Sequence, residues 1–178
     1  MPDYKTFLAL EQSQVHLVDE FQQRIKKKKN VKTLSNRWAF PLDRDLLASL
    51  IYRKMLHVAT TMDQKTVIGY VAGLSRFQIP PKLQPVTDTI CKNIDDNTPL
   101  FASVIISPDC HQESVFYSLA DQCYKEVAMR DYYSKIITLE QSNKYLNEFL
   151  RSMPFGVEEP IFTESFTPPI NVFVCYIA

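Results

Sequence analysis

Residues 100–140 read LFASVIISPDCHQESVFYSLADQCYKEVAMRDYYSKIITLE, and this stretch decides the fold. It opens with an apolar run, Leu100–Ser107, which Pro108 ends and which predicts a buried strand. From residue 112 to 130 the apolar residues recur at helical spacing. One face of this helix is apolar: Val115, Leu119, Cys123 and Val127. Lys135–Glu140 predicts a second strand, so strand, helix and strand in this order predict a right-handed crossover between parallel neighbours.

Outward from this unit, the hydrophobic spacing predicts a mixed α/β (α+β) chain. The further predicted strands are Tyr4–Leu10, Met55–Thr61, Thr66–Phe77, Pro160–Phe166 and Asn171–Ile177. The further predicted helices are Val15–Ile25, Pro41–Ile51 and Ser142–Met153. Hairpins on either side of the parallel pair are antiparallel, so we expect a mixed, mostly antiparallel sheet with helices on both faces. We expect residues 1–178 to form one domain, with a proline-rich insert at 78–99 that holds one short helix, Val86–Ile94.

The composition excludes several classes of protein. The 178 residues include only three glycines, Gly69, Gly73 and Gly156, where average usage of about 7% would give about twelve. No glycine-rich phosphate loop can therefore be present. The four cysteines, Cys91, Cys110, Cys123 and Cys175, form no C-x-x-C pair, so we expect free thiols and no metal site. No apolar run is long enough to span a bilayer, and we expect an intracellular protein, cytoplasmic or nuclear, without a membrane partner.

The charge balance is uneven along the chain. Residues 1–60 carry eleven Lys/Arg and six Asp/Glu, a net charge of +5. Residues 61–178 carry nine Lys/Arg and fourteen Asp/Glu, a net charge of −5. Much of the excess lies in Lys26–Lys29. This run predicts either an anion-binding patch or a solvated helix end. No aromatic residues interleave it, which favours the helix end and makes nucleic acid an improbable partner.

Residues 143–155 read NKYLNEFLRSMPF, where one family often reads N-x-x-A-x-x-L-Y-x-x-x-G-F in its penultimate helix. Asn143, Phe155 and the hydrophobic positions 146 and 149 fit. In this segment, and in the element order from about residue 4 to 178, the chain resembles the GNAT superfamily of acyl-CoA-dependent N-acyltransferases. The resemblance implies a GNAT-like three-layer fold. The proline-rich insert, and Phe40-Pro41-Leu42 where Glu-Pro-Leu is common, are similar to the arylalkylamine N-acetyltransferase branch.

The resemblance also implies where CoA would bind. Family members hold its pyrophosphate on backbone N–H groups at Q/R-x-x-G-x-G/A, where small residues let the backbone approach the phosphates. The matching residues here are His111, Gln112, Glu113, Ser114, Val115 and Phe116. Every defining position differs, which predicts a degenerate loop. The ring of Phe116 has two directions open to it: over the loop, where it would block phosphate, or into the core, where the amides would stay usable.

Two other family positions differ as well. Leu150 stands where a tyrosine usually protonates the leaving CoA thiolate, and Phe40 stands where the arylalkylamine branch has a glutamate base. The remaining candidates for a general base are Glu140, His57 and His111. Asp109-Cys110-His111 invites a nucleophile interpretation, but adjacent side chains point in different directions, so we expect Asp109 to cap the following helix instead.

The sequence therefore leaves two main hypotheses for the function. The first is a GNAT-like binding or interaction module, whose partner is a protein or peptide that adds a strand beside the diverging strands of the sheet. The alternative is an atypical N-acyltransferase that uses acetyl-CoA or another acyl-CoA as cofactor and a small amine as substrate. A third, an anion-binding adaptor, would use Lys26–Lys29.

Overall fold

The computed structural model describes residues 3–28, 34–35, 42–79, 81, 98–130, 133, 135–140, 144–152, 161–163 and 170–176. The strands are β1 (Tyr4–Leu8), β2 (Leu34–Ser35), β3 (Leu56–Thr61), β4 (Val67–Leu74), β5 (Leu100–Ile106), β6 (Lys135–Glu140), β7 (Ile161–Thr163) and β8 (Ile170–Tyr176). The helices are α1 (Ser13–Lys27), α2 (Arg44–Tyr52), α4 (Gln112–Ala128) and α5 (Lys144–Ser152), with a short 3-10 helix, η1 (Arg76–Gln78).

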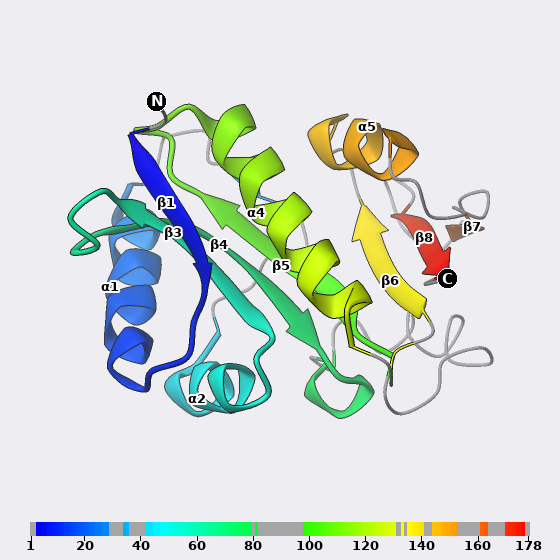
Figure 1. Ribbon diagram of the computed structural model, residues 1–178, viewed down its shortest axis with the longest axis horizontal. Helices are drawn as coiled ribbons and strands as arrows, with labels where there is room; N and C mark the ends of the chain where they lie inside the picture. The colour runs from blue at the N-terminus through cyan, green and yellow to red at the C-terminus, as the bar shows by residue number, and fades with distance from the viewer. Residues whose placement is uncertain are drawn as a thin grey trace.

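Among the described residues, the strands form one eight-stranded sheet. Seven strands follow the order β1-β3-β4-β5-β6-β8-β7, and β2 pairs with β5 outside this order (Figure 1). The pairing of β5 with β6 is parallel, whereas the other pairings are antiparallel. The predicted mixed, mostly antiparallel sheet is therefore confirmed, and α4 joins parallel neighbours as the crossover argument predicts.

Helices cover both faces of this sheet, which gives the predicted three layers. In Figure 1, α4 and α5 lie in front of the sheet, and α1 and α2 lie behind it. On the rear face the ring of Phe21 meets that of Tyr70 edge-on at 6.1 Å, and the Tyr70 hydroxyl donates to Gln22 Oε1 at 3.0 Å. On the front face α4 crosses β1, β3 and β4. No helix in the described part of the chain is long and apolar enough to cross a membrane.

Several element boundaries differ from the sequence prediction, among them those of α2 and β4. Helix α2 begins at Arg44, not at Pro41, because the Asp43 carboxylate accepts a hydrogen bond from the Leu46 N–H and caps the first turn. Strand β4 ends at Leu74, since η1 follows it. The sequence analysis did not predict β2, whose two residues have no hydrophobic period to detect. The predicted helix at 86–94, most of the insert at 78–99, and Phe40 lie outside the described residues.

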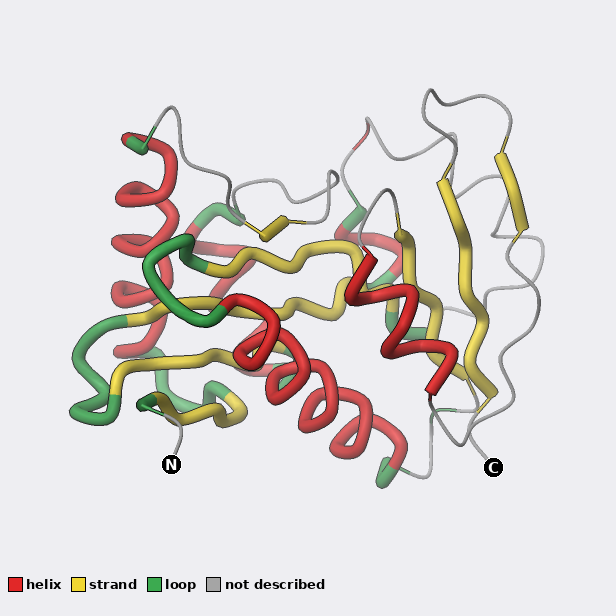
Figure 2. The backbone as a smooth tube through the Cα atoms, turned by 90° about the horizontal axis from the view of Figure 1, so that it is seen from above, coloured by secondary structure: helices red, strands yellow, loops and turns green. Residues whose placement is uncertain are grey.

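A register shift in β5 sets the shape of the sheet. Ala72 pairs with Ser103 and Gly73 with Phe101, so Ala102 is an extra residue on β5 and the strand bends there. Gly73 is required at this bend, because a Cβ atom at this position would lie 2.8 Å from the Phe101 ring. Beyond the bend, β6, β8 and β7 run at a steep angle to the strands on the other side (Figure 2).

Candidate functional site

The junction between β5 and α4 holds the six residues that the sequence analysis assigned to a cofactor loop. His111 is exposed and occupies the N-cap position of α4, but its side chain makes no capping hydrogen bond. The first turn also carries two exposed residues, Glu113 and Ser114, after the half-buried Gln112. The last two of the six, Val115 and Phe116, are fully buried.

The Phe116 ring takes the inward one of its two predicted directions. It is 0% exposed and does not project over the first turn of α4. It lies edge-on to the ring of Phe149 on α5, with the centroids 6.2 Å apart, and contacts Tyr117 at 5.6 Å. The Phe116 ring therefore does not block the N–H groups of the first turn of α4.

The rings of α4 and α5 pack against one another along a continuous seam, which we call the aromatic seam: Phe116, Tyr117, Tyr124, Tyr145 and Phe149. The centroid of the Tyr117 ring lies 6.5 Å from that of Tyr145 and 6.1 Å from that of Phe149. The centroids of the Tyr124 and Phe149 rings are 5.5 Å apart. The Tyr117 hydroxyl donates to Glu148 Oε2 at 3.4 Å. Tyr124 extends the packing to the sheet, where its ring lies 5.3 Å from Phe101 and its hydroxyl bonds to Thr138. The two helices are therefore in ring-to-ring contact on this face.

Negative charge gathers around the start of α4. The Asp109 carboxylate is 62% exposed, and Glu113 lies in the first turn. Lys28, at the end of α1, forms a salt bridge with Asp109, and its hydrogen bond is the main reason why the pKa of that carboxyl lies below its usual range. The prediction that Asp109 caps α4 is wrong, because His111 holds the N-cap position and the Asp109 side chain is turned toward Lys28 and Ser107.

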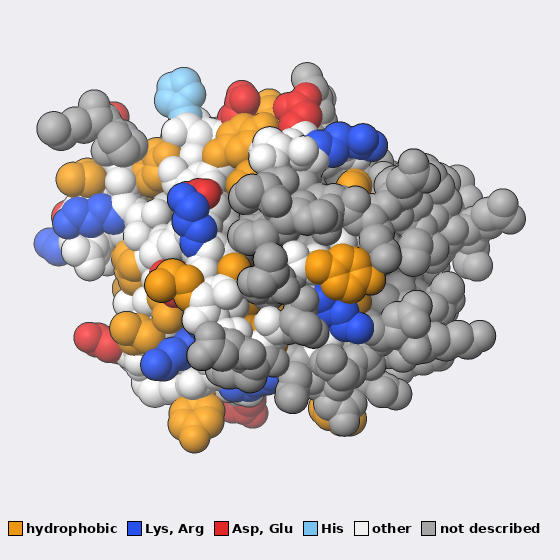
Figure 3. Space-filling view, turned by 45° about the vertical axis from the view of Figure 1, so that its right-hand side comes forward, with side chains coloured by type: hydrophobic (Ala, Val, Ile, Leu, Met, Phe, Trp, Pro, Cys, Tyr) orange, Lys and Arg blue, Asp and Glu red, His pale blue; other side chains and the backbone are white. Residues whose placement is uncertain are grey.

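The basic run is divided between structural positions. Lys26 and Lys27 belong to the last turn of α1, where cations complement the carbonyl end of a helix, and Lys28 pairs with Asp109. Lys29 lies outside the described residues. On the face in Figure 3 the described Lys and Arg side chains are scattered among other residues and form no continuous patch.

The other candidate catalytic residues are dispersed. The His57 side chain is 0% exposed, on the front face of β3 beneath α4, and its Nε2 lies 3.3 Å from Glu126 Oε2. Glu140 is the last residue of β6, which is separated from β3 by β4 and β5 in the sheet. Its side chain lies outside the described residues. The Cys110 thiol donates to the Ser107 carbonyl at 3.2 Å, and burial, followed by the charge of Asp109, raises its pKa. A raised thiol pKa disfavours the thiolate, so Cys110 is not an activated nucleophile.

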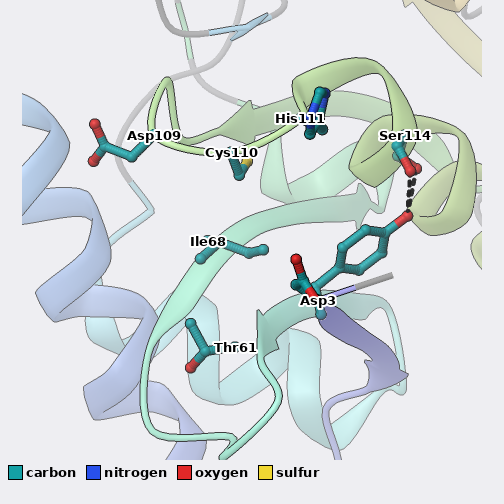
Figure 4. A pocket seen from close by; sticks show the side chains of 8 residues that line it. Asp3, Thr61, Ile68, Asp109, Cys110, His111 and Ser114 are labelled. Atoms are coloured by element: carbon teal, nitrogen blue, oxygen red, sulfur yellow. Dashed lines mark hydrogen bonds between the residues drawn. The ribbon is translucent and has the colours of Figure 1, made fainter. Parts of the chain in front are cut away.

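A cavity of about 420 Å³ lies on one side of the α4 N-terminus (Figure 4). The β5–α4 loop contributes Asp109, Cys110 and His111, α4 contributes Ser114, and the strand ends contribute Asp3, Tyr4, Thr61 and Ile68. Within the described residues, no group of three or more His, Cys, Asp or Glu could hold a metal ion. The sequence analysis did not assign Asp3, Tyr4, Thr61 or Ile68 to a site, since they come from strands remote in sequence.

The Tyr4 hydroxyl links the first strand to α4 at this cavity. It lies 2.9 Å from the Ser114 carbonyl oxygen, 2.7 Å from Ser114 Oγ and 2.9 Å from Ser118 Oγ. Replacing Tyr4 with phenylalanine is expected to lower the free energy of unfolding by about 1 kcal/mol in urea denaturation. Tyr52→Phe is the matched control, because Tyr52 is 85% exposed and its loss of a hydroxyl should change nothing. Equal effects of the two variants would contradict the role of the Tyr4 hydroxyl.

The second edge of β5 carries few strand pairings among the described residues, although Ser103 and Val104 on it are buried. On its first edge β5 pairs with β4 from Leu100 to Ile106. On the second edge, β6 pairs only at Leu100 and Phe101, and β2 pairs only at Ile105 and Ile106. Figure 2 shows β2 as a short isolated segment beside β5. Among the described pairings, the backbone of residues 102–104 has no strand partner on this edge.

Comparisons with known proteins support the fold and go no further. No family model matches the chain, and no curated protein matches its sequence. A GNAT-family acetyltransferase from Streptococcus pneumoniae superposes with a TM-score of 0.65 at 9% identity, over 98% of this chain and 99% of that one. A mosquito arylalkylamine N-acetyltransferase-like protein, 5b, gives 0.65 at 13% identity, over 97% and 99%. The chain has the GNAT acetyltransferase fold.

A third GNAT-fold structure, yncA from Salmonella typhimurium, was solved with its cofactor acetyl-CoA. It gives a TM-score of 0.61 at 12% identity, over 99% of this chain and 95% of that one. At such identities the similarity establishes the GNAT fold and not the activity. In this GNAT-fold chain Leu150 lies on α5, as the resemblance implies for the family's tyrosine position, but its side chain is outside the described residues.

Proposed function

We propose that this GNAT-fold chain is a non-catalytic binding module that recognises an extended segment of a partner protein. The observation that carries the proposal is the aromatic seam. The resemblance puts the CoA pyrophosphate at the start of α4 and the proton donor on α5, so a bound CoA would run between these helices. There the rings of Phe116 and Phe149 pack edge-to-face with their centroids 6.2 Å apart. Separating the two helices would expose this buried aromatic surface.

The charges at the start of α4 support the same proposal. A pyrophosphate needs N–H groups and cations, but Glu113 brings a carboxylate to the first turn of α4. Lys28, the nearest cation, already pairs with Asp109. The residues at this junction therefore do not fit CoA, and we derive no acyl-transfer step through it.

The second edge of β5 is the surface that we assign to the partner. A strand edge with unpaired N–H and C=O groups binds an extended peptide through main-chain hydrogen bonds. The gap at residues 102–104 lies between β6 and β2, at the bend that Ala102 produces. The proposal thus accounts for a sheet that keeps the GNAT architecture while its cofactor loop has changed.

Isothermal titration calorimetry with acetyl-CoA tests this proposal. We expect no heat of binding at micromolar concentrations of the nucleotide, because the seam and the carboxylates both oppose it. Salmonella yncA, which was solved with acetyl-CoA, serves as the positive control under the same conditions. Micromolar binding by this chain would overturn the non-catalytic proposal.

A second candidate function is an acyl-CoA-dependent N-acyltransferase that acts on a small amine. One observation favours it: Phe116 is buried and the His111 side chain does not cap α4, so the first-turn amides are not covered by either. The cavity beside this turn, about 420 Å³, has the size of a small-molecule site. A thiol-release assay with acetyl-CoA and an arylalkylamine panel tests this candidate, and the absence of release would remove it.

A further inference from the structure

The first strand of the chain ends the sheet on one side. β1 pairs with β3 along its whole length and is the last strand in the order β1-β3-β4-β5-β6-β8-β7. Among the described residues no strand pairs with its other edge, and Figure 2 shows β1 as the outermost strand, on the side of the N-terminus. None of its five residues is buried, and Lys5 is exposed. The outer edge of β1 is therefore an accessible sheet edge.

The hydrogen bonds between β1 and β3 show which backbone groups of β1 face outward. The Ala9 N–H donates to the Leu56 carbonyl at 2.8 Å, so these residues form a hydrogen-bonded pair. Such pairs alternate with non-hydrogen-bonded pairs along an antiparallel ladder, so Lys5 and Phe7 also bond to β3. The N–H and C=O groups that point away from β3 are those of Tyr4, Thr6 and Leu8. Within the described part of the chain these outward groups have no backbone partner.

An antiparallel copy of the same strand is complementary to this edge. With Thr6 opposite Thr6 of the second copy, Tyr4 lies opposite Leu8, and all five residues of β1 are paired. Each outward N–H then meets an outward C=O of the other copy, across a two-fold axis. Thr–Thr pairs are among the cross-strand contacts that stabilise antiparallel strands, and Tyr4 and Leu8 bring apolar surface together.

The backbone pattern and the charge of Lys5 select this register. A slip by one residue would set the outward groups of one copy against the inward groups of the other. A slip by two residues in one direction would place Lys5 opposite Lys5 of the second copy, where like charges destabilise a pair. The same slip in the other direction leaves part of β1 unpaired. In the register centred on Thr6, Lys5 lies opposite Phe7 and the two ammonium groups are not direct partners.

We propose that the outer edge of β1 is an interface between two copies of this chain, which join antiparallel into one continuous sheet about a two-fold axis at Thr6. The inference goes beyond the proposed function and does not depend on it. An interface built on five residues of each copy is small, so the dimer should be weak and should dissociate on dilution. Tyr4 also lines the cavity beside α4, so Leu8 of the second copy would lie next to one wall of this cavity.

Sedimentation velocity at chain concentrations from about 5 to about 500 μM tests the interface. We expect the weight-average mass of the unmodified chain to rise toward that of a dimer. Thr6→Pro removes the outward N–H at the two-fold axis but no hydrogen bond to β3, so it should raise the dissociation constant at least about thirtyfold. Thr6→Ala keeps this N–H and is the matched control, which should change the constant by no more than about fivefold. An unmodified chain that stays monomeric throughout, or equal association of the two variants, would overturn the inference.

A cross-link keeps the inference testable if the proline variant does not fold. Thr6 lies opposite itself in a hydrogen-bonded pair, where the Cα atoms are about 5.5 Å apart, a separation that a disulfide spans. In Thr6→Cys, oxidised glutathione should therefore oxidise two thiols to a disulfide between chains and be reduced to glutathione. Lys5→Cys lies on the same strand but opposite Phe7 of the second copy, so it should cross-link at least about tenfold more slowly.

Mass spectrometry of the proteolysed product identifies which residues are bridged and separates position 6 from the native cysteines. A bridge between the two copies of residue 6 supports the register. Equal rates for Thr6→Cys and Lys5→Cys, or no bridge at position 6 in a chain that is folded by circular dichroism, would contradict the pairing of β1 with itself.

Discussion

Replacing Phe116 with alanine is expected to lower the free energy of unfolding by about 3–5 kcal/mol, the usual cost of deleting a buried phenyl ring. The ring is 0% exposed and packs against Phe149 and Tyr117, so its loss leaves a cavity in the aromatic seam. The midpoint of urea denaturation, with the slope checked for constancy, measures the change. The result is informative because alanine is one of the small residues that the family motif has at this position.

Phe77→Ala is the matched control for this prediction. It makes the same chemical change at a ring that is 78% exposed, on η1, and should alter the stability by no more than about 0.5 kcal/mol. A loss at position 116 as small as the loss at position 77 would mean that the Phe116 ring lies at the surface of the loop. In that case the aromatic seam could not be the reason for excluding CoA.

The sequence predicted the sheet well because hydrophobic period and proline positions are local signals. The predicted strand Lys135–Glu140 has the same bounds as β6. The apolar run that ends at Pro108 forms β5. The parallel pairing of these two strands followed from the crossover rule and is confirmed. What the sequence could not show is β2, since a two-residue strand depends on a partner edge seventy residues away and not on its own composition.

The candidate site was predictable only in part, for a related reason. Alignment on Pro108 located the start of α4 and its six residues, and the motif alone left both directions of the Phe116 ring open. The choice depends on Phe149, on another helix, whose ring receives it. Likewise the capping role expected for Asp109 failed because Lys28, eighty-one residues earlier, draws its carboxylate away. Such tertiary pairings have no signature in a single sequence.

Acidification is expected to destabilise the chain through His57. Its imidazole is fully buried on β3, and its Nδ1 has no hydrogen-bond partner among the described residues. Burial is the main reason why its pKa lies below the usual 6.5; Glu126 opposes this shift, and the charge of Arg130 adds to it. The Glu126 carboxylate is shared, because its Oε1 accepts a hydrogen bond from Gln122 at 3.0 Å. Protonated His57 would therefore be a cation in a site built for the neutral ring.

The sign and the pH window of this effect follow from proton linkage. Below pH 6.5 His57 becomes protonated in the unfolded chain, whereas in the folded chain its imidazole stays neutral to lower pH. The unfolded state therefore binds more protons, and the free energy of unfolding decreases as the pH is lowered. One group contributes at most about 1.4 kcal/mol per pH unit. The exposed Asp63 and Asp109 carboxyls, whose pKa values lie below their usual 3.8, affect stability only at more acidic pH.

Urea denaturation between pH 7.5 and pH 5 measures this dependence in three chains. The unmodified chain should lose stability as the pH falls, and His57→Gln, which keeps an amide donor near Glu126 but cannot titrate, should lose much less. His16→Gln removes a histidine that is 64% exposed and lies 3.2 Å from Glu20, so it should leave the profile of the unmodified chain unchanged. If His57→Gln retained the full pH dependence, the buried imidazole could not be its source. A flattened profile would show that the protonation of this buried ring, which lies between β3 and α4, is the source of the pH dependence of unfolding.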